Sequence, residues 1–164
     1  MLRISRILRE ADRPVTTARH HGRSGIVVIW NLTNRCNLSC PHCYTHATSK
    51  KLSNELDTRQ CKSVIDDLAR QNVMVLILSG GEPVLRPDLY ELAAYARDKK
   101  ILCALSTNGT LINDLHLRKI LKSGIGYVGI SIDGIGRNHD EFRGKQGAYA
   151  ASLNAIRLCR DAGL

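Results

Sequence analysis

Strongly apolar stretches alternate with helical patterns along the chain from residue 26 onward. The apolar stretches are residues 26–30, 73–78, 101–105 and 127–132. They are mostly continuous rather than alternating, which is typical of strands buried on both faces of a parallel sheet. Four such strands, each followed by a helical segment, predict four βα units and therefore an α/β fold with a parallel sheet.

The helical segments are located by apolar residues that recur at the spacing of one helix face. These residues are Cys61, Val64, Ile65 and Leu68 in the first segment, Leu89, Leu92, Ala93 and Ala96 in the second, Leu117, Ile120 and Leu121 in the third, and Tyr149, Leu153, Ile156 and Cys159 in the fourth. Asp57 and Thr58 are candidates for the N-cap of the first helix. Gly124 fits the position just after the end of the third.

Three cysteines, Cys36, Cys40 and Cys43, lie within eight residues shortly after the first predicted strand. Thiolates favour soft metal centres, and three of them leave a position for a ligand that is not protein. A [4Fe–4S] cluster held in this way keeps one iron open, and an open position distinguishes a catalytic metal site from a closed structural one. Ferredoxin spacings use four cysteines and differ from this one.

Other interpretations of the triplet remain open at this point. His46 lies three residues after Cys43 and would complete a Cys3His zinc site. The thiols could instead be reduced structural cysteines. The spacing would also place them on one face of a helix, but Pro41, Asn34 and Asn37 favour a loop.

A glycine turn follows the second strand. Gly80 and Gly81 allow close approach of a ligand, and their carbonyls can accept hydrogen bonds from an ammonium group, to which Glu82 adds a negative charge. Two glycines after a strand also make an ordinary tight turn. Because ligands bind at the carboxyl ends of the strands in parallel sheets, we expect this turn and the cysteine loop to share one site.

Polar segments also follow the third and fourth strands. Residues 106–109 read Ser-Thr-Asn-Gly, and their hydroxyls and amide could bond the diol of a sugar. Residues 131–134 read Ser-Ile-Asp-Gly. Arg143 either clamps a carboxylate in a two-pronged pair or lies on the surface as an ordinary arginine.

Together these segments carry a family resemblance. They are Cys36-x3-Cys40-x2-Cys43-Tyr44, Gly80-Gly81-Glu82-Pro83, Thr107-Asn108-Gly109 and Ser131-Ile132-Asp133-Gly134. In this order, over residues 26–164, they closely resemble the radical SAM superfamily. The resemblance implies a partial (β/α)6 TIM-like barrel, of which the first four βα units are present, and a [4Fe–4S] cluster on Cys36, Cys40 and Cys43. It also implies S-adenosylmethionine (SAM) as the ligand of the open iron.

The resemblance implies a role for further residues. Gly80, Gly81 and Glu82 would hold the methionine amino group. Ser106, Asn108 and Ser131 would approach the ribose or the carboxylate, Arg143 the carboxylate, and the backbone of Tyr44 the adenine. The implied activity is reductive cleavage of SAM, which starts radical chemistry on a substrate.

The opening MLRISRILRE and residues 28–33 and 36–44 are similar to the superfamily members of heme d1 biosynthesis. This resemblance implies a carboxylate-rich tetrapyrrole as substrate and a reductant protein such as a flavodoxin or ferredoxin as partner. Peptide and protein maturases share the pattern of residues 131–134, so peptide maturation stays an alternative. A zinc-binding interaction module or nucleic-acid module is an alternative of another class.

Composition limits the partners. The formal net charge of +9 favours acidic ligands such as a polycarboxylate. Only one Trp, five Tyr and one Phe are present, which argues against a base-stacking nucleic-acid surface. The apolar stretches are too short to span a bilayer, and the N-terminus has no long apolar signal region. We therefore expect a cytoplasmic protein without nucleic-acid or membrane partners.

Two expectations concern the ends of the chain. Residues 1–25 are predicted to form a basic extension, in which Leu2, Ile4, Ile7 and Leu8 could form one apolar face of a short helix. Residues 26–164 are predicted to be the N-terminal part of the radical SAM core, because the fifth and sixth βα units and any region for auxiliary clusters do not follow. Cys61, Cys103 and Cys159 are expected to be small buried apolar residues.

Overall fold

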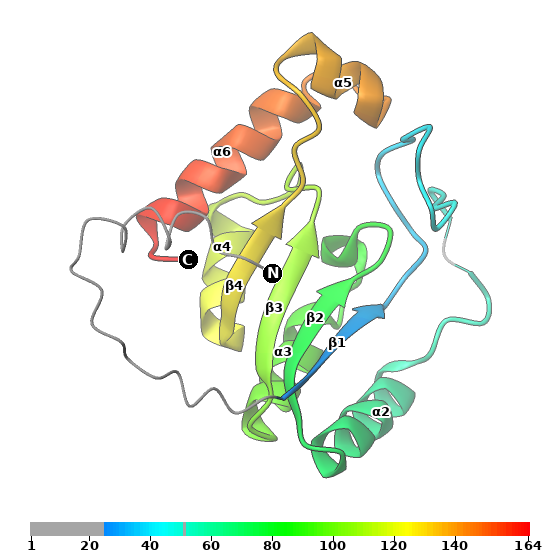
Figure 1. The fold of residues 1–164 in the computed structure, drawn as a ribbon, viewed down its shortest axis with the longest axis vertical. Helices are drawn as coiled ribbons and strands as arrows, with labels where there is room; N and C mark the ends of the chain where they lie inside the picture. Colours follow the sequence, from blue (N-terminus) through cyan, green and yellow to red (C-terminus); the bar gives the residue numbers. More distant parts are fainter. Residues whose placement is uncertain (1–24, 51) are drawn as a thin grey trace.

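The structure, a computed structural model, describes residues 25–50 and 52–164. Strands and helices alternate in it as the sequence predicts (Figure 1). The strands are β1 (Ile26–Asn31), β2 (Val73–Ser79), β3 (Leu102–Thr107) and β4 (Ile125–Ile130). The helices are α2 (Thr58–Arg70), α3 (Leu89–Asp98), α4 (Asp114–Ser123), α5 (Arg137–Arg143) and α6 (Ala148–Asp161), with a 3-10 turn η1 (Pro83–Leu85). The expected basic extension, except for Gly25, lies outside the described residues.

The four strands form one parallel sheet in the order β1-β2-β3-β4. The register pairs Ile29 with Ile77, Ile77 with Ala104, and Ala104 with Tyr127. Because side chains alternate between the two faces of a strand, these four residues share one face of the sheet. All four carboxyl ends therefore meet at the same edge, as the sequence predicts for the site.

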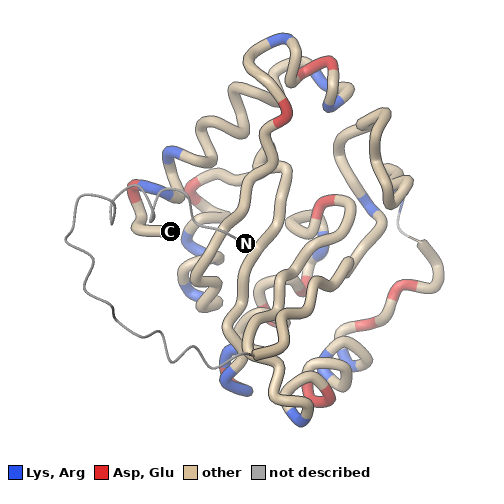
Figure 2. The backbone as a smooth tube through the Cα atoms, in the orientation of Figure 1, with Lys and Arg blue, Asp and Glu red and all other residues tan. Residues whose placement is uncertain are grey.

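Helices cover the other face of the sheet, where the core lies. Leu76, Leu78 and Leu105 of the strands are almost completely buried, as are Ile65 of α2 and Leu92 of α3. Figure 1 shows α3 and α4 behind the sheet. The strands carry no Lys, Arg, Asp or Glu, which are confined to helices and loops in Figure 2. The charged side chains of the described residues therefore lie outside the sheet.

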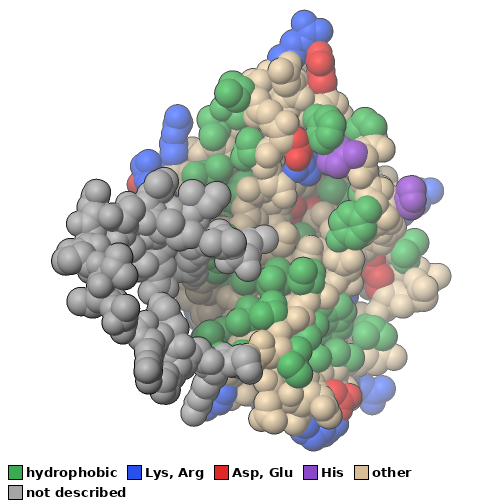
Figure 3. Space-filling model, viewed as in Figure 1, with side chains coloured by type: hydrophobic (Ala, Val, Ile, Leu, Met, Phe, Trp, Pro, Cys, Tyr) green, Lys and Arg blue, Asp and Glu red, His purple; other side chains and the backbone are tan. Residues whose placement is uncertain are grey.

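The face opposite the helices is open, contrary to the expectation that both faces are buried. Val27, Ile29 and Leu102 on this face are 56%, 66% and 65% exposed. Figure 3 shows apolar side chains gathered over β1 and β2 on this side. A continuous apolar run does not distinguish a face covered by helices from one that lines the interior of a partial barrel.

The predicted helix ends agree with the structure. Asp57 caps α2 and forms a capping box with Gln60. Gly124 ends α4 with φ 80°, a left-handed conformation that glycine adopts without strain. Among the described residues, no helix has both the length and the apolar composition needed to cross a membrane.

Two helical features differ from the expectations. Helix α5 was not predicted, because it has only seven residues and no extended apolar repeat. In α6 the apolar spacing predicted Tyr149, Leu153, Ile156 and Cys159 as the buried side. The residues buried there are Ala148, Ser152, Ala155 and Cys159. Small side chains allow the helix to pack closely. A search for large apolar residues at helical spacing does not detect a buried face made of such small residues.

Candidate functional site

A cavity of about 260 Å³ opens at the carboxyl ends of the strands. The residues that line it are Cys36, Leu38, Cys40, His42, Cys43, Tyr44, Thr45, Ala47, Ser79, Gly80, Gly81, Ser106, Thr107, Asn108, Ser131 and Arg143. The cavity thus brings together every site residue predicted from the sequence except Glu82. These residues come from the carboxyl ends of the strands and from the loops and the helix α5 that follow them.

The cysteine loop carries thiols whose surroundings differ. Burial raises the pKa of the Cys36 thiol, against the hydrogen bond that its sulfur accepts from the Leu38 amide at 3.4 Å. For Cys43, burial also acts to raise the pKa, but hydrogen bonds from Thr45 and Ala47 outweigh it and the pKa is lowered. Because the thiolate is the metal ligand, the Cys43 environment favours the form that binds metal.

The donor set fits an iron–sulfur cluster better than a single zinc ion. Zinc needs its ligands at about 2.0–2.3 Å, and no three His, Cys, Asp or Glu side chains of the described part of the chain converge closely enough to hold one ion. His46, the fourth zinc ligand considered above, does not line the cavity. A [4Fe–4S] cluster is wider and takes one cysteine per iron, which suits thiols spread around one cavity.

The other three cysteines lie elsewhere. Cys61, Cys103 and Cys159 are buried in the core, and none of them lines this cavity. All six cysteines of the chain are unpaired thiols. Burial raises the pKa of Cys103 to about 11, so this thiol stays neutral, as expected for a small apolar residue.

The segment that leads into Cys36 is attached to the glycine turn. The amide of Gly81 donates to the Thr33 carbonyl oxygen at 2.7 Å, and the amide of Glu82 donates to the Arg35 carbonyl oxygen at 2.8 Å. These bonds extend the parallel pairing of β1 and β2 beyond the strand ends. The two halves of the candidate site are therefore held together by backbone contacts.

Glycine is required at this turn because the two backbones approach closely. A Cβ placed on Gly80 would lie 2.5 Å from the Thr33 carbonyl oxygen, and one on Gly81 would lie 2.6 Å from the Arg35 carbonyl oxygen. Gly80 also has φ 148°. The space that these glycines provide is thus occupied by the stem of the cysteine loop.

Glu82 lies behind the cavity, with no exposed surface. Its Oε1 accepts hydrogen bonds from the Val84 amide at 3.1 Å and the Thr107 hydroxyl at 2.8 Å, and its Oε2 accepts one from the Asn108 amide at 2.8 Å. Burial raises the pKa of Glu82, and these three bonds oppose that rise. The contacts of Glu82 in the structure join the glycine turn to the end of β3 and the loop that follows it. Direct contact between Glu82 and an ammonium group therefore stays a prediction.

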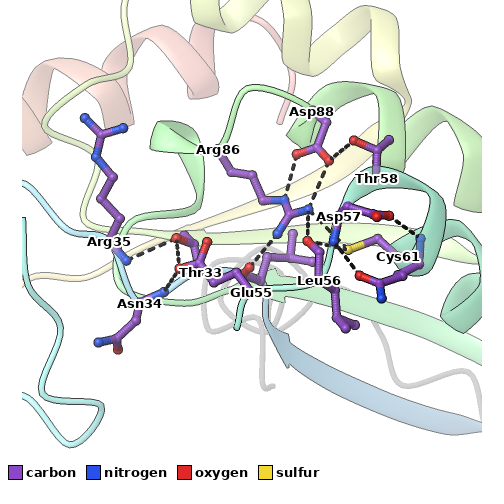
Figure 4. Close-up of polar contacts among 12 residues, drawn as sticks. Thr33, Asn34, Arg35, Glu55, Leu56, Asp57, Thr58, Cys61, Arg86 and Asp88 are labelled. Atoms are coloured by element: carbon purple, nitrogen blue, oxygen red, sulfur yellow. Dashed lines mark hydrogen bonds and ion pairs between the residues drawn. The ribbon is translucent and has the colours of Figure 1, made fainter. Parts of the chain in front are cut away.

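A buried arginine that the sequence did not single out supports the same stem (Figure 4). Arg86 donates to the carbonyl oxygens of Leu32 at 2.8 Å and Leu56 at 2.9 Å. It also forms a bidentate pair with Asp88 at 2.7 and 3.0 Å, and Asp88 accepts a hydrogen bond from the Thr58 hydroxyl. One guanidinium group thus joins the end of β1 to the starts of α2 and α3.

Glu55 completes this support. Its Oε1 accepts hydrogen bonds from the Thr33 hydroxyl at 2.8 Å and the Asn34 amide at 2.9 Å. The Thr33 hydroxyl oxygen in turn accepts from the Arg35 amide at 3.1 Å (Figure 4). The segment before Cys36 is therefore fixed on one side by side chains and on the other by the glycine turn.

Helix α5 closes the other end of the cysteine loop. The guanidinium of Arg143 pairs with Asp133 at 2.5 Å and lies 3.9 Å from the Cys40 sulfur. The Ser39 hydroxyl donates to the Gly144 carbonyl oxygen at 3.3 Å. His139, the buried residue of α5, accepts a hydrogen bond at Nδ1 from the Asp133 amide at 3.1 Å. Arg143 is thus oriented toward the cavity.

The comparisons with curated proteins found several relatives. The chain is 49% identical over 138 residues to Fe-coproporphyrin III synthase of Methanosarcina barkeri, covering 84% of this chain and 35% of that protein. It is 44% identical over 164 residues to pre-heme d1 synthase of Dinoroseobacter shibae, covering 100% and 41%. It is 38% identical over 139 residues to the mycofactocin maturase of Mycobacterium ulcerans, covering 84% and 37%. The chain thus spans about two-fifths of the length of these relatives.

Solved structures share the fold. Streptococcus suis SuiB bound to S-adenosylmethionine superposes with a TM-score of 0.72 at 18% identity, covering 85% of this chain and 32% of that one. This likeness confirms the predicted α/β architecture of a partial TIM-like barrel. The family model of the radical SAM superfamily matches residues 30–164. With the cysteine loop, the glycine turn and the polar strand ends gathered at one cavity, the chain belongs to the radical SAM superfamily, whose members use a [4Fe–4S] cluster and SAM.

Proposed function

We propose that this chain provides the cofactor site of an enzyme that cleaves SAM reductively and starts radical chemistry on a tetrapyrrole in heme d1 biosynthesis. The observation that carries the proposal is the single cavity lined by three thiols and seven further residues predicted from the sequence. Cys36, Cys40 and Cys43 would hold a [4Fe–4S] cluster there, which would supply the electron for reductive cleavage of SAM and so start radical chemistry on the substrate.

The residues of the chain have distinct tasks in this proposal. Cys36, Cys40 and Cys43 would bind the cluster as thiolates and would leave one iron open for SAM. The carbonyls of Gly80 and Gly81 accept hydrogen bonds from the methionine ammonium group, and Glu82 fixes the turn from behind.

Three side chains and one backbone segment complete the pocket. Arg143 and Ser131 face the SAM carboxylate, with the charge of Arg143 directed by its pair with Asp133. Ser106, together with Asn108, lies at the third strand end, where a ribose diol would be bonded. The backbone of Tyr44 lies near the adenine.

Two observations support a tetrapyrrole substrate. The similarity to pre-heme d1 synthase extends over all 164 residues, and the net charge of +9 suits a substrate with several carboxylates. Peptide maturation is the second candidate, supported by the relative that is a mycofactocin maturase. A flavodoxin or ferredoxin would supply the electron, and reduced thiols suit the cytoplasm.

Anaerobic reconstitution tests the proposal. The chain should bind iron and sulfide and become brown, and alanine at Cys36, Cys40 or Cys43 should abolish iron uptake. Alanine at Cys61, Cys103 or Cys159 should lower only stability, because these thiols lie in the core. Full iron uptake by Cys40→Ala, or a colourless protein that holds zinc, would contradict the assignment. Titration with iron coproporphyrin III, followed by absorbance, tests the substrate class against a precursor peptide.

A further inference from the structure

Three side chains join the cysteine loop to the loop after β3 in a closed ring of hydrogen bonds. Asn37, between Cys36 and Cys40, donates from Nδ2 to the Thr110 hydroxyl at 2.8 Å. The Thr110 hydroxyl donates to Asn108 Oδ1 at 2.7 Å, and Asn108 Nδ2 donates to Asn37 Oδ1 at 3.0 Å. The residues of the two loops are more than 70 positions apart in sequence, so the ring is a tertiary clasp.

Asn108 is the fixed member of this clasp. It is 6% exposed, its amide donates to Glu82, and its carbonyl accepts from the Ser152 hydroxyl at 2.8 Å. Its Oδ1 accepts two hydrogen bonds, from the amide and the hydroxyl of Thr110. Because the oxygen is occupied by two donors, the NH2 group must face the cysteine loop.

The NH2 group of Asn108 also reaches a cysteine. Its nitrogen lies 3.9 Å from the Cys36 sulfur, within the reach of an N–H···S contact. Cys36 is buried, and its sulfur otherwise accepts from the Leu38 amide. Hydrogen bonds to the cysteine sulfurs of an iron–sulfur centre, together with net charge and exposure, set its reduction potential.

We propose that Asn108 is a positioning residue for the cluster: its carboxamide clasps the cysteine loop through Asn37 and donates to the Cys36 sulfur, which holds that ligand in place and raises the reduction potential of the centre. The inference rests on the proposed function, because it requires a cluster on Cys36. It assigns the carboxamide to the cluster side of the cavity, whereas the family resemblance places Asn108 at the ribose or carboxylate of SAM.

Two substitutions distinguish the effect of the hydrogen-bonded ring from the effect of the Asn108 NH2 group on the Cys36 sulfur. Asn108→Asp keeps an oxygen for Thr110 but replaces the NH2 group with a second oxygen that faces Asn37 Oδ1 and the Cys36 sulfur. Thr110→Val opens the ring but leaves the Asn108 NH2 group in place. Asn113→Asp is the matched control, because Asn113 caps α4 away from the cavity and aspartate caps equally well.

The measurements are made on the reconstituted 164-residue chain. We expect both Asn108→Asp and Thr110→Val to lose iron to a chelator more readily, by about 10- to 100-fold in affinity, as for other residues that orient metal ligands. Only Asn108→Asp should lower the midpoint potential of the cluster in an anaerobic redox titration followed by electron paramagnetic resonance. Asn113→Asp should match the unsubstituted chain in both measurements.

Several outcomes would overturn the inference. A midpoint potential and iron retention of Asn108→Asp equal to those of the control would do so, as would a loss of SAM affinity without a change in either. If Asn108→Asp does not fold, Asn108→Ser removes the carboxamide without adding charge and is judged by the same criteria. Absence of iron uptake by the unsubstituted chain would overturn the proposed function together with the inference, which distinguishes the two failures.

Discussion

The Gly81 amide donates a hydrogen bond of 2.7 Å to the Thr33 carbonyl oxygen. Thr33 lies just after the end of β1, and Gly81 lies just after the end of β2. Thr33 stands three residues before Cys36, so this bond ties the turn proposed to hold SAM to the loop proposed to hold the cluster. A change in the position of either backbone is therefore transmitted directly to the other.

The first prediction concerns the close contact at this turn. A Cβ on Gly81 would lie 2.6 Å from the Arg35 carbonyl oxygen, so Gly81→Ala must push the two segments apart. We expect a loss of about 1–3 kcal/mol in the free energy of unfolding, the usual cost of overpacking. Urea denaturation measures it. Gly126→Ala in β4 is the matched control, because nothing lies within 4 Å of its Cβ position; an equal loss in both variants would contradict the prediction.

The second prediction concerns the pH dependence of Glu82. Burial raises the pKa of Glu82 above its unfolded value of about 4.3, so folding favours the protonated carboxyl. This contribution to stability is fully present below the unfolded pKa and is lost as pH rises through the folded pKa.

Glu82→Gln should remove this pH dependence. At low pH the variant should be the less stable by about 1–3 kcal/mol, since the amide NH2 cannot accept from the Asn108 or Thr107 donors. The deficit should shrink as pH rises. Urea denaturation from about pH 4 to about pH 8 measures the difference, and Glu91→Gln, on the surface of α3, controls for general charge effects. A deficit that grows with pH would show that the sign is wrong.

The sequence was sufficient to predict the βα order and the edge of the sheet at which the cavity lies. Parallel strands bring their carboxyl ends to one edge, so segments such as 36–43 and 80–82 had to meet there. Residue type then limited the chemistry, since thiols bind soft metals and a glycine turn admits close approach. These inferences need only local pattern and topology.

The contacts behind the cavity could not be predicted from the sequence. The charge of Glu82 suits an ammonium group, and that contact stays a prediction. Its hydrogen bonds with Thr107 and Asn108, more than 20 residues away, could not be foreseen from the sequence. Arg86 and Asn37 lie among polar loop residues without a distinctive spacing. Their roles depend on which loops become neighbours in space, which pattern alone does not determine.

The third prediction concerns the buried pair of Arg86 and Asp88. Arg86 is 7% exposed, so Arg86→Met should leave Asp88 without its cation and cost about 3–5 kcal/mol in the free energy of unfolding. Adding Asp88→Asn should restore part of this loss, and a double-mutant cycle measures the coupling. The surface pair of Arg160 and Asp161 supplies the control; Arg160→Met should cost about 1 kcal/mol or less. Additive effects of the two changes at Arg86 and Asp88 would refute the coupling.

The last prediction concerns the contact between α5 and the cysteine loop. Gly144 has φ 63°, and a Cβ there would lie 2.7 Å from the Ser39 carbonyl oxygen and 2.6 Å from its hydroxyl oxygen. Gly147 has a similar φ of 79° but open space around its Cβ position. Alanine at either position incurs the left-handed backbone cost of about 1–2 kcal/mol, but only Gly144→Ala displaces the loop next to Cys40. We therefore expect both variants to lose a similar free energy of unfolding from backbone strain, with an additional loss of about 1–3 kcal/mol from overpacking in Gly144→Ala.

Iron retention against a chelator after anaerobic reconstitution should fall in Gly144→Ala and stay unchanged in Gly147→Ala. Equal iron retention in the two variants would show that α5 does not hold the cysteine loop in place, because the backbone cost is common to both and the contact with Ser39 is the difference between them.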